Sequence, residues 1–155
     1  MKYTPSTLAR FAPALLLFIG SLAMPAHAQF AKAEDAIKYR KGALTVMGAH
    51  FSRVAAMAGG RVPYDAKAAA ENAAIAESMS KLPWAGFPDG SDKGETKAKP
   101  EIWLDKARFA ESAEKMQTEM TKLTVAARVG TLDALKPAVS SVAATCKNCH
   151  DNFRQ

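Results

Sequence analysis

Two cysteines, Cys146 and Cys149, stand three residues apart, and His150 follows directly in this chain of 155 residues. A Cys-x-x-Cys-His run is typical of covalent haem c attachment. Each thiol can form a thioether to a haem vinyl group, and the imidazole can bind the iron. On a helix, residues i, i+3 and i+4 share one face. The spacing therefore predicts one haem c per chain, attached at both cysteines, with His150 as axial iron ligand.

Two other chemistries use paired cysteines, and the sequence favours neither. A structural zinc site needs four ligands, and after the leader described below the chain has no further cysteine and only His50 as another histidine, so carboxylates would have to complete the site. A redox disulfide of the thioredoxin type sits at the start of a helix that follows a strand. Here the pair falls late in a predicted helix, so haem attachment is the favoured interpretation.

Residues 1–28 have the features of a secretory signal peptide. Lys2 and Arg10 precede an apolar stretch at 11–20, and Ala26-His27-Ala28 fits a small-residue cleavage site. The apolar stretch is shorter than the roughly 20 residues that a membrane-spanning helix needs. We expect cleavage after Ala28, a periplasmic location and no membrane insertion.

The mature chain, residues 29–155, has the length of one ordinary domain. Loss of the leader leaves 19 basic residues against 15 acidic ones, a formal charge of +4. Because lysines and acids are interleaved, the charge pattern argues against a nucleic-acid surface. Two cysteines this close together provide no long-range disulfide framework. Function should therefore depend on local chemistry at the motif.

Apolar residues recur at steps of three and four in four stretches, which predicts an all-α fold. We expect helices at about 33–57, 65–81, 100–129 and 132–153. Short connections after the first and third helices make neighbours antiparallel, so the expected architecture is an up-down-up-down four-helix bundle.

The apolar seams indicate which face of each helix is buried. In the last helix the seam is Leu132, Leu135, Val139, Val142, Cys146, Cys149 and Phe153. Both cysteines thus take core positions, which puts the haem in the core of the bundle. Pro137 interrupts one helical hydrogen bond and predicts a kink or a tightened first turn. In the second helix the expected seam is Ala68, Ile75, Met79 and Leu82.

The connection from 81 to 99 is long and rich in proline and glycine. Connections of this length are usually functional or mobile. It is either a surface loop whose Trp84 and Phe87 patch the core, or a segment that lines the cofactor pocket.

A sixth iron ligand would have to come from upstream, because only five residues follow His150. Met47 in the first helix could bind iron, although a methionine at helical spacing is more often core filling. His50 lies beside the apolar seam and is expected at its boundary. The simplest expectation is an open or apolar-capped sixth site, and the alternative is a low-spin electron shuttle with Met47 as sixth ligand.

Arg40 breaks the apolar pattern of the first helix between Ile37 and Leu44. A buried cation needs an anion, and a haem propionate would supply one, with Lys41 alongside. The other interpretation is that the side chain reaches solvent at the end of the bundle.

Over residues 29–155 the chain resembles cytochrome c′, the high-spin branch of the class II c-type cytochromes. The resemblance rests on the haem motif and on several short stretches: Phe30-Ala31-Lys32, Glu34-Asp35-Ala36-Ile37-Lys38-Tyr39-Arg40, Ala43-Leu44-Thr45, His50-Phe51, Leu82-Pro83-Trp84, Pro100-Glu101-Ile102-Trp103 and Arg154.

The resemblance implies roles for residues outside the motif. Leu44 would be the distal apolar residue that crowds the open sixth site, and Met47 would be packing. Residues near the propionates would be Arg40, Lys41 and Thr96. Arg154 would lie on the proximal side, against the axial histidine His150.

The resemblance also implies a function. A five-coordinate, high-spin haem would bind nitric oxide and carbon monoxide and transfer electrons, with a role in nitric oxide handling. An apolar lid offers no hydrogen-bond donor to bound dioxygen, so selection works by exclusion. A homodimer through the first helices is implied as well, while the redox partner is not identified. No catalytic acid or base is found, so a gas-binding, electron-transfer protein is favoured over an enzyme that reduces nitric oxide.

Overall fold

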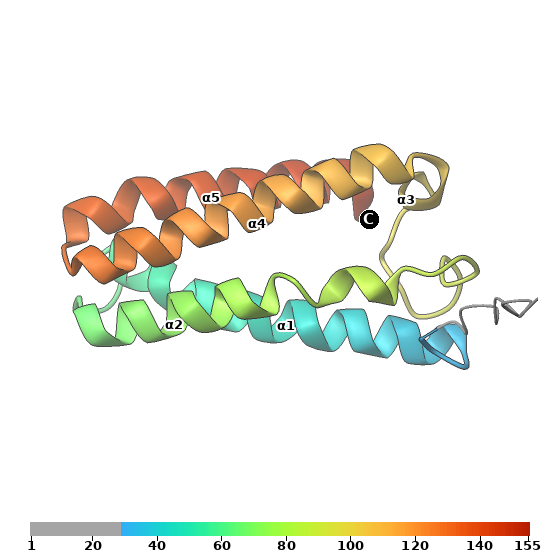
Figure 1. Cartoon of the computed structure of the whole chain (residues 1–155), viewed down its shortest axis with the longest axis horizontal. Coiled ribbons are helices and arrows are strands. Elements are labelled where there is room, and N and C mark those ends of the chain that lie inside the picture. Colours follow the sequence, from blue (N-terminus) through green and yellow to red (C-terminus); the bar gives the residue numbers. More distant parts are fainter. Residues whose placement is uncertain (1–28) are drawn as a thin grey trace, which may run out of the picture.

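The computed structural model describes residues 29–155, all of whose regular elements are helical (Figure 1). The helices are α1 (Ala33–Ala58), α2 (Ala66–Met79), the 3₁₀ helix η1 (Pro83–Gly86), α3 (Glu101–Leu104), α4 (Lys106–Val129) and α5 (Leu132–Phe153). The predicted signal peptide lies outside the described residues. Within 29–155, no helix combines the length and apolarity needed to cross a bilayer.

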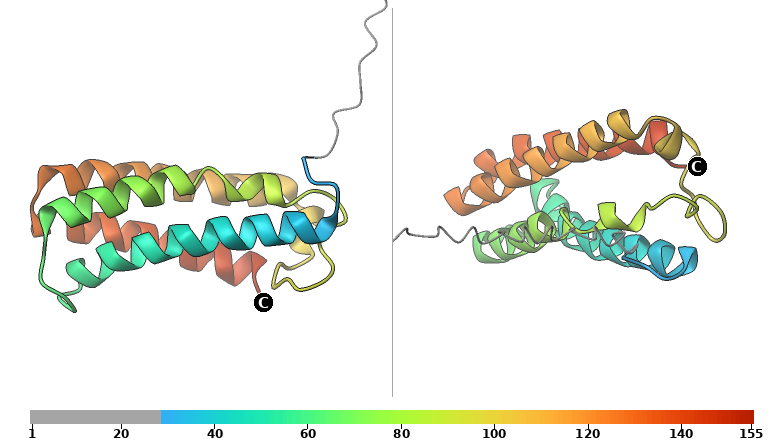
Figure 2. Two further views of the ribbon diagram at one scale, coloured as in Figure 1. Left: turned by 90° about the horizontal axis from the view of Figure 1, so that it is seen from below. Right: turned by 45° about the vertical axis from the view of Figure 1, so that its right-hand side comes forward.

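The four long helices form two antiparallel pairs, α1 with α2 and α4 with α5, and α2 packs against α4 (Figure 1). This arrangement confirms the predicted four-helix bundle. The two pairs diverge toward the end of the bundle that holds α3 and the end of α5 (Figures 1 and 2). The contact between α1 and α5 is smaller than any of these three helix–helix contacts. Elements between α2 and α4 also join the two pairs, since η1 contacts α1 and α3 contacts α4 and α5.

Side-chain caps define where α2, α4 and α5 begin. Asp65, Asp105 and Thr131 accept hydrogen bonds from backbone N–H groups three residues later, at 2.9, 3.0 and 3.3 Å. Gly130 ends α4 in the left-handed conformation, with φ of 78°. Only Gly130 and Thr131 separate α4 from α5, so the two helices must lie antiparallel.

The predicted helix over 100–129 is wrong in its first part, because the structure breaks it at Asp105. This residue has φ of −130° and ψ of 69°, and its carboxylate caps α4 instead of continuing the turn before it. The preceding turn, α3, becomes a separate element. It carries Ile102 and Trp103 toward the segment that follows η1.

The predicted seam of α2 is also wrong at two positions, since Ile75 and Leu82 are 41% and 42% exposed. The fully buried residues of α2 are the alanines Ala69, Ala73 and Ala76. Their small side chains let neighbouring helices approach the α2 backbone. Thr124 of α4 accordingly donates a hydrogen bond to the carbonyl of Ala73 at 3.3 Å.

The buried core is contributed by all four long helices. Its largest members are Met47, Val54, Met57, Met116, Met120, Leu123, Leu135 and Val142. Helix α5 runs through Pro137 without ending, and the predicted bend there stays a prediction.

Replacing Leu135 by Ala should lower the free energy of unfolding by about 2–5 kcal/mol, because it removes a fully buried side chain and leaves a cavity. Leu104→Ala is the matched control, since Leu104 is 82% exposed and its loss should change stability by less than about 0.5 kcal/mol. Urea unfolding of the haem-loaded protein, followed by far-UV circular dichroism, measures both. Equal midpoints for the two variants would contradict the assigned core.

Candidate functional site

The last two turns of α5 carry the motif. Cys146 and Cys149 are free, half-buried thiols, and Cys146 packs against the buried core. His150 is exposed and belongs to the same unbroken helix. The predicted helical spacing of these three side chains is therefore realised, and they share one face.

Burial shifts the pKa of each of the three motif side chains. Burial raises the pKa of both thiols, and the neighbouring Cys146 raises that of Cys149 further. Burial, and then the positive charge of Arg154, lower the pKa of His150, while Asp151 opposes them. The imidazole therefore favours its neutral form, the form in which a ring nitrogen can bind a metal.

Arg40 on α1 is 2% exposed, so the interpretation that it reaches solvent is wrong. Its Nη1 donates to the Gly86 carbonyl at 2.7 Å and to Ser91 Oγ at 2.8 Å. Its Nη2 donates to the Ser91 carbonyl and to Thr96 Oγ1, both at 2.8 Å.

The charge of Arg40 has no acidic partner. All four of its hydrogen-bond acceptors are neutral, and in residues 29–155 no carboxylate lies within 4.0 Å of this side chain. Burial lowers the pKa of the guanidinium. The positive charge is hydrogen-bonded but not balanced.

Two aromatic rings complete the surroundings of the guanidinium. The Cζ atom of Arg40 lies 4.5 Å from the ring centroid of Phe87 and 5.7 Å from that of Trp103. Both are cation–π distances. Phe87 thus contacts a predicted cofactor residue, while Trp84 packs against the core. The interpretation that the aromatic residues patch the core thus holds for Trp84, and the interpretation that the connection lines the cofactor pocket stays a prediction.

Residues 87–99, which we call the strap, connect α1 to the end of α5. On the α1 side, Lys41 Nζ donates to the Glu95 carbonyl at 3.3 Å, beside the Arg40 contacts. On the α5 side, two backbone hydrogen bonds join the strap to the end of the chain. The N–H of Lys99 donates to the Phe153 carbonyl at 3.0 Å, and the N–H of Gln155 donates to the Lys97 carbonyl at 2.8 Å. The strap is therefore a packed part of this end of the bundle.

The structure brings the predicted site residues into two groups. Arg40, Lys41 and Thr96 meet where the strap contacts α1. The second group, Cys146, Cys149, His150 and Arg154, lies at the end of α5, where an antiparallel bridge pairs Ala98 of the strap with Arg154. Between the side chains of Arg154 and His150 no hydrogen bond forms, so the proximal role of Arg154 stays a prediction.

The remaining predicted residues lie further along α1. Leu44 follows Arg40 by one helical turn, is half-buried and packs against the core. Met47 is itself a core member, 8% exposed. His50 is half-buried, with Nδ1 2.8 Å from Asn72 Oδ1 of α2, which confirms its expected boundary position.

Sequence reasoning missed Ser91 and Gly86, which hold Arg40. Ser91 is fully buried, and its type gives no sign of this in a polar stretch. A Cβ on Gly86 would lie 2.7 Å from Arg40 Cβ and 2.9 Å from the Ala36 carbonyl oxygen. Only glycine allows η1 to approach α1 this closely.

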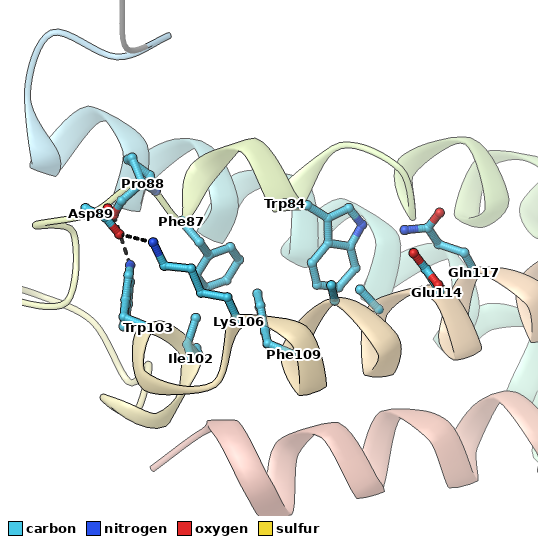
Figure 3. A pocket seen from close by; sticks show the side chains of 12 residues that line it. Trp84, Phe87, Pro88, Asp89, Ile102, Trp103, Lys106, Phe109, Glu114 and Gln117 are labelled. Atoms are coloured by element: carbon cyan, nitrogen blue, oxygen red, sulfur yellow. Dashed lines mark hydrogen bonds and ion pairs between the residues drawn. The ribbon is translucent and has the colours of Figure 1, made fainter.

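A groove of about 580 Å³ lies between η1, the strap and α4 (Figure 3). Its aromatic walls are Trp84, Phe87, Trp103 and Phe109, and the Asp89–Lys106 ion pair, at 2.6 Å, stands at one end. Glu114 and Gln117 stand at the other end (Figure 3). Cys146, Cys149 and His150 are not among the residues that line this groove.

The residues present fit a haem c. Two thiols and an imidazole share one helix face, the neighbouring interior is apolar, and a buried cation without a carboxylate partner suits an anionic propionate. Zinc would need further ligands. In the described part of the chain, no three His, Cys, Asp or Glu side chains gather closely enough to hold a metal ion.

Comparison with known proteins agrees with this site. The family model described as cytochrome c′ matches residues 35–154. A cytochrome c′ from Rubrivivax gelatinosus is 47% identical over 128 residues, which cover 82% of this chain and 99% of that protein. Its crystal structure aligns with a TM-score of 0.79, over 82% of this chain and all of that one.

A second solved relative is a nitric oxide complex of a leucine-to-alanine variant of cytochrome c′ from Alcaligenes xylosoxidans. It is 43% identical, with a TM-score of 0.76, and the alignment covers 82% of this chain and 98% of that one. The family match, the identities and the Cys-x-x-Cys-His helix agree. The chain therefore belongs to the cytochrome c′ family, whose members carry covalently attached haem c.

Proposed function

We propose that this protein is a periplasmic cytochrome whose five-coordinate, high-spin haem binds nitric oxide and carbon monoxide and transfers electrons, with a role in nitric oxide handling. The observation that carries the proposal is the apolar character of α1 beyond Arg40, where Leu44 and Met47 both pack against the core. Nitric oxide complexes of relatives from Alcaligenes xylosoxidans support the choice of ligand.

The proposal gives each site residue a task. Cys146 and Cys149 hold the haem by thioethers, and His150 binds its iron. Arg40, Lys41 and Thr96, which meet at the strap, attract the propionates, and Arg154 accompanies His150. When bound, the haem would supply an iron to which a small neutral gas can coordinate.

Leu44 selects among ligands because its side chain is bulky and apolar. Its side chain has no hydrogen-bond donor, so it gives no help to a ligand that becomes polarised on binding, such as dioxygen. Its bulk also disfavours larger anions. Nitric oxide needs neither a donor nor much room.

Met47 is proposed as packing and not as sixth ligand, because it belongs to the buried core with Val54 and Met57. Pairing of two copies through α1 is proposed from the family resemblance. Val46, an apolar residue of α1 that is 40% exposed, is available for such a contact.

The visible spectrum of the purified protein, ferric and ferrous, tests the proposal. A broad, high-spin ferrous spectrum that changes when carbon monoxide or nitric oxide is added is the expected result. Sharp, split low-spin bands that do not respond to either gas would contradict it, since they would show that an upstream residue such as Met47 occupies the sixth position.

Replacing Leu44 by Ala should speed carbon monoxide binding to the reduced protein by about tenfold or more, equivalent to lowering the barrier by about 1.4 kcal/mol. The reason is that a smaller side chain crowds the sixth site less. Flash photolysis or stopped-flow mixing measures the rate. Val125→Ala, at a residue of α4 that is 59% exposed, is the control and should leave the rate unchanged. Equal binding rates in the two variants would show that Leu44 does not control access to the iron.

Replacing Cys146 or Cys149 by Ser should leave a single thioether, and replacing both should abolish covalent attachment, because a hydroxyl does not add to a vinyl group as a thiol does. Haem staining after denaturing electrophoresis, with mass spectrometry of the chain, measures attachment. Ser141→Ala, at an exposed residue of the same helix, should retain full staining. Haem that stays bound to the doubly substituted chain under denaturing conditions would disprove the assignment.

A further inference from the structure

Ser91 occupies a central position in the contacts of Arg40. It is fully buried, at 0% exposure. Its hydroxyl accepts from Arg40 Nη1 and donates to the Pro88 carbonyl, both at 2.8 Å. Its carbonyl accepts from Arg40 Nη2, also at 2.8 Å. One residue thus receives two of the four hydrogen bonds of the guanidinium.

These two hydrogen bonds fix the orientation of the charge. A guanidinium is a planar fork, so acceptors on both terminal nitrogens define its plane. The ring of Phe87 packs against the guanidinium, with its centroid 4.5 Å from Cζ. The Gly86 carbonyl accepts a further hydrogen bond from Nη1, and Thr96 Oγ1 accepts one from Nη2. Removal of the Ser91 hydroxyl would leave one Nη1 hydrogen bond unmade inside the protein and would favour movement of the cation toward water.

We infer that Ser91 is a positioning residue, which holds the charge of Arg40 beside the haem and thereby raises the haem reduction potential. Reduction adds an electron, and a fixed positive charge nearby stabilises the reduced form. This inference rests on the proposed placement of Arg40 near the propionates. Ser91 itself acts only through Arg40.

A merely structural role for Ser91 in the strap is the competing explanation, and Ser80 provides a matched control. Ser80 is also fully buried, and its hydroxyl also donates to the carbonyl three residues earlier, that of Glu77, at 2.7 Å. It makes no hydrogen bond to Arg40. The two serines therefore differ in whether they hydrogen-bond to Arg40.

The test measures the haem reduction potential by spectroelectrochemistry in four haem-loaded variants: Ser91→Ala, Arg40→Leu, the double variant and Ser80→Ala. Arg40→Leu should lower the potential, because it removes the cation. Ser91→Ala should lower it by less, and Ser80→Ala should leave it unchanged. In the double variant the potential should equal that of Arg40→Leu alone, since Ser91 has no charge left to position.

Each deviation identifies what has failed. If Arg40→Leu shifts the potential but Ser91→Ala does not, the positioning role is overturned and the placement of Arg40 survives. If Arg40→Leu produces no shift, the placement of Arg40 is overturned together with the inference. A Ser91→Ala shift that persists without Arg40, or that Ser80→Ala reproduces, also overturns it. Where Arg40→Leu does not fold, Arg40→Gln replaces it, because the glutamine amide keeps hydrogen-bonding groups but carries no charge. Ser91→Ala should then have no further effect, since no charge remains to be positioned.

Discussion

A positive charge that is withdrawn from water must donate hydrogen bonds to acceptors that replace the lost water, or the fold loses the free energy of its hydration. Arg40 meets this condition with donors to two backbone carbonyls and two hydroxyls, which come from η1 and the strap. The requirement explains the local structure. Gly86 has no side chain where α1 approaches, and Ser91 is buried despite its polar type. The strap follows α1 because the guanidinium needs its acceptors.

The neutrality of those acceptors matters as much as their number. A carboxylate partner would balance the charge of Arg40 within the protein. Carbonyls and hydroxyls solvate the charge but leave its field intact, so this end of the bundle remains attractive to an anion from outside the chain. An apolar interior with one uncompensated cation at its edge suits a flat, hydrophobic group with acidic substituents. Haem has these two properties.

The sequence predicted what is encoded within single helices. The motif residues share one face of α5, and Met47 is buried as the apolar seam of α1 predicted, whereas the pattern left open whether Arg40 is buried or reaches solvent. The sequence-based predictions failed where side-chain volume sets which residue is buried, or where one residue can serve either of two helices. In α2, alanines were buried instead of Ile75 because helices pack closely there, and Asp105 served α4 as a cap instead of prolonging α3. Ser91 could not be found in this way, because it lies 51 residues from Arg40 and no local pattern records that contact.

The strap also has a consequence for the order in which the protein folds. The α1–α2 and α4–α5 pairs join neighbours along the chain, whereas the strap reaches Arg40 and Asp151 across 51 and 52 residues. Contacts between distant residues form late, because loop-closure entropy must be overcome first. We therefore expect the two helical hairpins to assemble before the strap packs against the end of the bundle. During that interval the cysteine thiols of α5 would remain accessible, which would leave time for a large planar group to be attached before the strap covers it.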